Sequence, residues 1–117
     1  MKNNIVVYQE SDLRTKIHMR EGEQKLGEKL VVMKLGEGLE NLIQYVNRGI
    51  TYVLLGIPES VGPMANYGKC CTDHAWSAFL YAFLNMHSNQ FLAGDNILCL
   101  GHVDTGAINT EAGLLDK

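Results

Sequence analysis

The clearest periodic segment of the chain lies near its middle. Apolar residues stand at positions 39, 42, 43 and 46, and most of the intervening positions are polar. This spacing predicts one amphipathic helix, and Gly49 stands where a glycine commonly ends a helix. Residues 50–55 follow directly as a near-continuous apolar run that ends at Gly56. Such a run is typical of a strand buried on both faces of a parallel sheet.

A second helix and a second buried strand follow further along the chain. Residues 73–86 predict a helix, with Thr72 or Asp73 suited to cap its first turn. Its polar residues are spaced by four and form a narrow edge, whereas its apolar face is broad. The polar edge consists of Ser77, Tyr81 and Asn85, and the apolar face of Trp76, Phe79, Leu80, Phe83 and Leu84. Residues 97–100, directly before Gly101, predict another buried strand.

The N-terminal part of the chain is less regular. Residues 5–8 are β-branched and aromatic and predict a short strand, and residues 31–33 predict a second one. Charged residues dominate between them, so we expect residues 9–36 to form a solvated strap or loop region. Taken together, the elements predict a single α/β domain over residues 1–117.

Composition and charge narrow the class of protein. The chain has 117 residues, of which 46% are hydrophobic and 20% charged, and its net charge is -3. This composition is that of a globular domain, and the absence of a basic excess argues against a nucleic-acid partner. No apolar stretch approaches the roughly 20 residues of a membrane-spanning helix, and the N-terminus lacks a signal-peptide pattern. We therefore expect no membrane partner and a cytoplasmic location.

The cysteines and the histidine at the end of a predicted strand are candidate sites of chemistry. Cys70 and Cys71 are adjacent, and Cys99 lies inside an apolar run, so free thiols are expected rather than disulfides or a zinc site. His102 and Asp104 would point to the same side of an extended strand, which makes a metal-binding pair conceivable. Because no third ligand is close in sequence, we favour a simple strand end at these residues.

The long connection between residues 56 and 71 is the segment with most functional interest. Its glycines are six residues apart and match neither a dinucleotide-binding fingerprint nor a phosphate-binding loop. Loops of this length in compact domains are uncommon unless they are functional. Its polar groups include Glu59, Asn66 and Lys69.

At this point the residues resemble a known family. In formimidoylglutamase-like members of the arginase/agmatinase (ureohydrolase) superfamily, the corresponding segments read LLGIPEDIGVRANYGRPGA, AWDAFL, FLN and LLGHLD. The N-terminal strap of that family is similar to residues 20–28 of this chain. The matching segments here are residues 53–62 (VLLGIPESVG), 65–69 (ANYGK), 75–80 (AWSAFL), 83–86 (FLNM) and 98–104 (LCLGHVD).

The resemblance implies a fold and a chemistry. The expected fold is a three-layer α/β/α arrangement with a mostly parallel, arginase-like sheet, of which this chain would be the N-terminal portion. The implied activity is hydrolysis of a C–N bond in a guanidino or formimino compound, with two Mn²⁺ ions that lower the pKa of a bridging water. The family's metal ligands lie in motifs of the type G-G-x-H, D-A-H-x-D and D-x-D, which this sequence does not contain. We therefore expect neither metal ligands nor catalytic residues in this chain, which would be inactive alone.

The resemblance also implies roles for the long loop. Asn66, Lys69 and Glu59 correspond to a loop near the mouth of the family's active site and are the expected substrate-loop residues for an amidine or guanidine substrate. The chain departs from the family in having residues 69–71 (KCC) where Arg-Pro-Gly is common, and Pro63 where Val is common. Lysine in place of arginine keeps the charge but loses the planar fork that binds a carboxylate.

Two other functions stay open. One is a non-catalytic α/β domain derived from the same family and retained for folding or interaction, and the other is a small nucleotide-binding domain. Because the first strands of a truncated parallel sheet would leave a bare edge and an uncovered apolar face, we also expect the chain to form a homo-oligomer.

Overall fold

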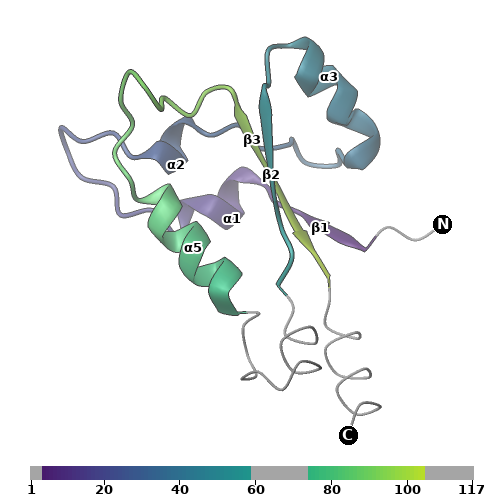
Figure 1. Ribbon diagram of the computed structural model, residues 1–117, viewed down its shortest axis with the longest axis horizontal. Coiled ribbons are helices and arrows are strands. Elements are labelled where there is room, and N and C mark those ends of the chain that lie inside the picture. The colour runs from purple at the N-terminus through teal and green to yellow at the C-terminus, as the bar shows by residue number, and fades with distance from the viewer. Residues whose placement is uncertain (1–3, 59–73, 105–117) are drawn as a thin grey trace, which may run out of the picture.

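The computed structural model describes residues 4–58 and 74–104. In this part of the chain a sheet has the order β1-β3-β2, from β1 (Ile5–Val7), β2 (Tyr52–Gly56) and β3 (Ile97–Val103) (Figure 1). The central strand β3 is antiparallel to β1 and parallel to β2. The chain is therefore an α/β protein, as predicted, but its described sheet is mixed rather than mostly parallel.

Short helices lie on both sides of this sheet. Figure 1 places α1 (Glu10–Arg14), α2 (Leu26–Lys29) and α5 (His74–Leu84) on one side and α3 (Leu42–Asn47) on the other. A 3-10 turn, η1 (Leu39–Asn41), leads into α3. The helix ends before Gly49, whose φ is 110°. The predicted helices and their positions are thus confirmed, although Thr72 and Asp73 lie outside the described residues.

The strand β3 carries an apolar cluster on each of its faces. Its successive side chains alternate between the two sides of the sheet, as in any extended strand. Both sets are buried, which confirms the prediction of a buried strand. Ile97 and Cys99 pack with Leu13, Leu26, Leu30, Leu80 and Leu84, whereas Leu98 and Leu100 pack with Met33, Tyr45 and Ile50.

The prediction that residues 50–55 form a strand buried on both faces is wrong. Tyr52 is 61% exposed, Val53 41% and Leu55 37%. The physical reason is position: β2 lies at an edge of the described sheet and pairs only with β3 there. An apolar run indicates that a strand can be buried. Whether its side chains are buried depends on the elements that pack against them.

The apolar face expected on the helix over residues 39–46 is also largely uncovered. Ile43 is 62% exposed and Val46 45%, whereas Tyr45 is buried at 5% exposure. The helix therefore packs through the tyrosine ring. The hydroxyl of Tyr45 accepts a hydrogen bond from the Lys34 amide at 3.2 Å and bonds the Glu37 carboxylate.

The strap region over residues 9–36 is more ordered than predicted. It contains α1 and α2, and Leu13, Leu26 and Leu30 are buried against the sheet. Helices of five and four residues are too short to show a helical period in the sequence. The expected strand at residues 31–33 is reduced to an isolated bridge between Val31 and Leu98. Over the residues described, no helix has the length and apolar character needed to cross a membrane.

Candidate functional site

The parallel strands β2 and β3 end at the same edge of the sheet. Gly56 at the end of β2 pairs with His102 near the end of β3, after a bulge between Leu54 and Leu55. Ligands of open parallel sheets gather outside the carboxyl ends of the strands. This edge, where Ile57 leaves β2, is therefore the candidate site.

A hydrogen-bonded chain of aromatic side chains lies at this edge and joins three elements. The Trp76 indole Nε1–H of α5 donates to the Tyr8 hydroxyl oxygen at 2.9 Å. The same hydroxyl lies 2.5 Å from His102 Nδ1, and the Tyr8 and His102 rings meet edge to face with centroids 5.3 Å apart. An indole can only donate, so the Tyr8 hydroxyl keeps its own proton, and we infer that it donates this proton to His102 Nδ1. A neutral His102 then carries its own proton on Nε2.

The environment of Tyr8 keeps its hydroxyl protonated. Burial raises the pKa of Tyr8 above its ordinary value, and the bond from Trp76 opposes this effect only in part. A phenol with a raised pKa is a hydrogen-bond donor at neutral pH and not a base. We therefore interpret the Trp76–Tyr8–His102 chain as a device that orients the imidazole at the end of β3.

Two glycines permit the close packing at this edge. A Cβ on Gly56 would lie 2.1 Å from Cε2 of Trp76, so the indole covers the end of β2. A Cβ on Gly101 would lie 1.8 Å from the carbonyl oxygen of Val6, and the φ of Gly101 is 150°. Any larger residue at either position would separate β2 from α5 or β1 from β3.

The structure places the predicted strand-end pair in structural contacts. His102 bonds Tyr8, and the Asp104 amide donates to the Asn4 carbonyl at 2.6 Å, which continues the β1–β3 pairing. Within residues 4–58 and 74–104, no group of three or more His, Cys, Asp or Glu side chains is arranged to hold a metal ion. Glu59, Asn66 and Lys69, the predicted substrate-loop residues, lie outside the described residues, as do Cys70 and Cys71.

Cys99 is the described cysteine, and it is a buried free thiol, as predicted. Burial raises the pKa of its thiol to about 12. The thiolate is the nucleophilic form of cysteine, so Cys99 is unreactive at neutral pH.

The polar edge of α5 binds the strap. The amide of His18 donates to Asn85 Oδ1 at 2.7 Å, and Asn85 Nδ2 donates to the Lys16 carbonyl at 2.8 Å. The His18 ring also bonds the Tyr81 hydroxyl. Further along, Lys25 Nζ lies 3.1 Å from Glu23 Oε2. Two residues of the predicted polar edge, Tyr81 and Asn85, thus bind the strap at Lys16 and His18.

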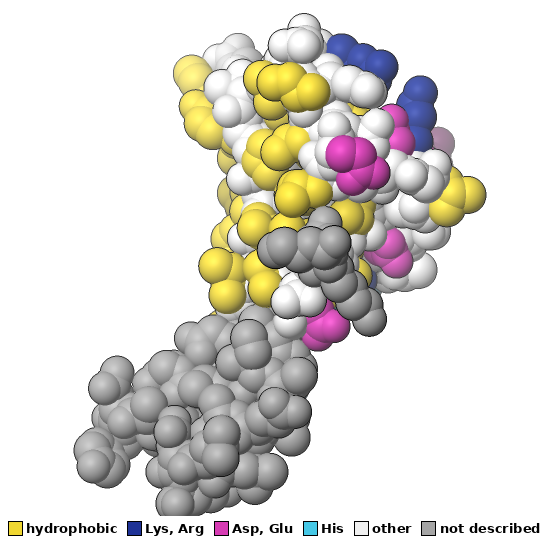
Figure 2. All heavy atoms as spheres, turned by 90° about the vertical axis from the view of Figure 1, so that its right-hand side faces the viewer, with side chains coloured by type: hydrophobic (Ala, Val, Ile, Leu, Met, Phe, Trp, Pro, Cys, Tyr) yellow, Lys and Arg dark blue, Asp and Glu magenta, His cyan; other side chains and the backbone are white. Residues whose placement is uncertain are grey.

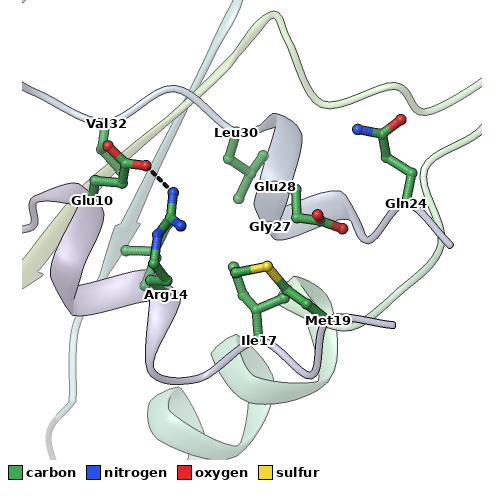
Figure 3. Close-up of a pocket in the computed structure, with 10 residues that line it drawn as sticks. Glu10, Arg14, Ile17, Met19, Gln24, Gly27, Glu28, Leu30 and Val32 are labelled. Atoms are coloured by element: carbon green, nitrogen blue, oxygen red, sulfur yellow. Dashed lines mark hydrogen bonds and ion pairs between the residues drawn. The ribbon is translucent and has the colours of Figure 1, made fainter. Parts of the chain in front are cut away.

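A hollow lies on the strap side of the molecule. It has a volume of about 410 Å³, and Figure 3 shows Ile17, Met19 and Leu30 around it, with the ion pair of Glu10 and Arg14 at one side. All of its lining residues belong to the strap region, including its helices α1 and α2. It is therefore separate from the strand ends.

Sequence reasoning missed Tyr8 and Trp76 as members of the site. The sequence predicts a strand position for Tyr8 and an apolar helix face for Trp76. Both carry a polar group on an aromatic body, which normally finds a partner when buried, and that was the available signal. No family model, no curated protein and no solved structure matches the chain.

Proposed function

We propose that this chain is the N-terminal segment of a ureohydrolase-like metal-dependent hydrolase of the cytoplasm. It would supply scaffold and one active-site loop for hydrolysis of a C–N bond in a formimino or guanidino compound. The fold we propose for the whole protein is the three-layer, arginase-like α/β/α arrangement.

One observation carries this proposal more than any other. The segments that resemble the family are distant in sequence, yet their residues meet at one edge of the sheet. Gly56 from VLLGIPESVG contacts Trp76 from AWSAFL, and Gly56 pairs with His102 from LCLGHVD. These segments would occur together in one sequence because their residues form one local structure.

The chain's own contribution would be positional. The segment that contains Glu59, Asn66 and Lys69 follows β2 in the sequence, on the carboxyl side of Gly56. In this proposal the packing of Trp76 on Gly56 fixes where that loop begins, and Lys69 and Asn66 contact the substrate.

The residues described do not by themselves fit a pair of manganese ions. Their chemistry at the strand ends is one imidazole and one carboxylate, His102 and Asp104, and no larger group of ligating side chains occurs among them. Two bridged ions require several carboxylate and imidazole ligands. We therefore assign the metal ligands to a further segment of the protein. We propose no catalytic step for the residues of this chain.

Fragment complementation tests the proposal. The 117-residue chain is mixed with a separately produced C-terminal portion of a formimidoylglutamase that carries the ligand motifs, and Mn²⁺ is added. Turnover of formiminoglutamate, arginine and agmatine is then measured for each part and for the mixture. We expect turnover from the mixture alone. A Gly56→Val variant, which cannot accommodate Trp76, serves as the control that should not complement.

A second function is favoured by the exposed apolar surface of β2 and α3. In this alternative the chain is a non-catalytic α/β interaction domain derived from the same family. It predicts that the chain folds and associates but yields no turnover in any combination. Complementation therefore separates the two functions.

A further inference from the structure

The imidazole of His102 is bonded through one nitrogen only within the described part of the chain. Its Nδ1 lies 2.5 Å from the Tyr8 hydroxyl, and no described residue bonds its Nε2. His102 is half-buried, and Nε2 is not buried without a partner there, so it reaches the surface. Because the Tyr8 hydroxyl donates to Nδ1, a neutral His102 presents an accessible N–H group at Nε2.

This donor lies at the carboxyl ends of the parallel strands, where ligands of open sheets gather. His102 pairs with Gly56 in the register, and its partner Tyr8 packs with Trp76 against one apolar cluster. Figure 2 shows the molecule from the side of α3, where apolar side chains form a column from the top downwards. Among the described residues, the hydrogen-bonded aromatic chain at this sheet edge therefore faces α5.

The contacts of the His102 ring fix its direction before any ligand arrives. The Tyr8 ring meets the imidazole edge to face, with centroids 5.3 Å apart, and Trp76 Nε1 holds the Tyr8 hydroxyl at 2.9 Å. A donor that is already oriented loses little conformational freedom when it binds. The accessible N–H group of His102 is therefore suited to hold a ligand atom.

The chemistry of this donor decides which part of a ligand it can hold. A protonated amidine or guanidine has N–H donors and no acceptor, so it cannot accept a bond from Nε2–H. A carboxylate has only acceptor oxygens, and its hydrogen bonds are stronger than those of a neutral carbonyl. Asp104 is the next carboxylate along the chain, but it is exposed, so water and salt screen its charge.

We propose that Nε2–H of His102 binds a carboxylate group of the substrate. This inference rests on the proposed hydrolase function and narrows its substrate class. Amidines and guanidines that carry a carboxylate, such as formiminoglutamate and arginine, are bound in preference to compounds without one, such as agmatine. His102 takes no part in the hydrolysis itself, and Tyr8 is its positioning residue.

Nitrogen NMR of the 117-residue chain with isotope-labelled histidine tests this binding without any turnover. Arginine and agmatine differ by one carboxylate, and each is added at constant pH and ionic strength. We expect the His102 Nε2 signal to move progressively with arginine and not with agmatine. His87 is the internal control, because its side chain is exposed but lies beside Lys25 and Glu23, and its signal should not distinguish the two compounds. Equal shifts of His102 with both compounds, or no shift with arginine, would overturn the proposal.

Kinetics of the complemented mixture give a second readout. His102→Ala removes the donor and should raise the KM for formiminoglutamate at least about tenfold, with kcat changed less than about threefold. His102→Gln keeps an N–H donor and should raise KM less. Equal KM values for the two variants, or a loss of kcat with KM unchanged, would contradict the proposal. An inactive wild-type mixture would contradict the hydrolase function instead, and the NMR titration would still decide whether His102 binds a carboxylate.

Discussion

Trp76 lies so close to Gly56 that a Cβ on the glycine would come within 2.1 Å of the indole Cε2 atom. This contact joins the helix α5 to the end of β2. Gly56→Ala should therefore destabilise the fold by about 1–3 kcal/mol, the usual cost of overpacking. Urea unfolding followed by circular dichroism measures this difference.

Gly38→Ala is the control for that experiment. Its added Cβ would meet only the carboxylate end of Glu40, a flexible side chain that can move aside. We expect a change of about 0.5 kcal/mol or less, as for most surface substitutions. Equal destabilisation by the two variants would show that the indole contact has no special importance.

The hydroxyl of Tyr8 connects Trp76 to His102. Tyr8→Phe removes the hydroxyl and leaves the indole N–H and His102 Nδ1 without their partner. Loss of a partly buried hydrogen-bond partner costs about 1–3 kcal/mol. Nitrogen chemical shifts of His102 should show the Nε2–H tautomer in the wild type and a mixture in the variant. An unchanged tautomer balance would contradict the inferred direction of the Tyr8 bond.

Alkaline pH should destabilise the protein through Cys99. Burial raises the pKa of this thiol from 9.0 to about 12. A raised pKa in the folded state means that the thiol stabilises the fold below pH 9 and that this contribution is lost as the pH rises towards 12. The slope reaches at most about 1.4 kcal/mol per pH unit for one group.

Cys99→Ala isolates that contribution. Tyr8 and Tyr45 also have raised pKa values and should add to the alkaline loss in both proteins. The free energy of unfolding measured from pH 8 to 11 should fall more steeply for the wild type than for the variant. Parallel curves would mean that the thiol is not buried in solution.

Asn85 bonds the strap at two points, the His18 amide and the Lys16 carbonyl. Asn85→Ala should release this part of the strap and cost about 1–2 kcal/mol. The local readout is faster hydrogen exchange over residues 15–25. Ser77→Ala on the same helix edge is the matched control, because Ser77 is exposed, and it should leave exchange in the strap unchanged.

Local pattern was sufficient to predict β3, the main helices and the free Cys99. Local pattern was insufficient to predict which side chains are buried, because burial depends on the elements packed against them. The apolar runs of β2 and α3 were correctly placed, but no described element covers their exposed side chains. Tyr8 and His102 are 94 residues apart, and only the antiparallel pairing of β1 with β3 brings them together. Glu59, Asn66 and Lys69 lie outside the described residues and stay predictions from the resemblance.

Manganese-dependent turnover by the chain alone and by its complex with a ligand-bearing C-terminal segment tests the central claim most directly. We predict no turnover from the 117-residue chain with Mn²⁺, and turnover of an amidine or guanidine compound once the complex has formed. Turnover by the isolated chain, or a complex that forms and stays inactive, would contradict the claim that this chain is the scaffold of a ureohydrolase whose metal ligands lie elsewhere.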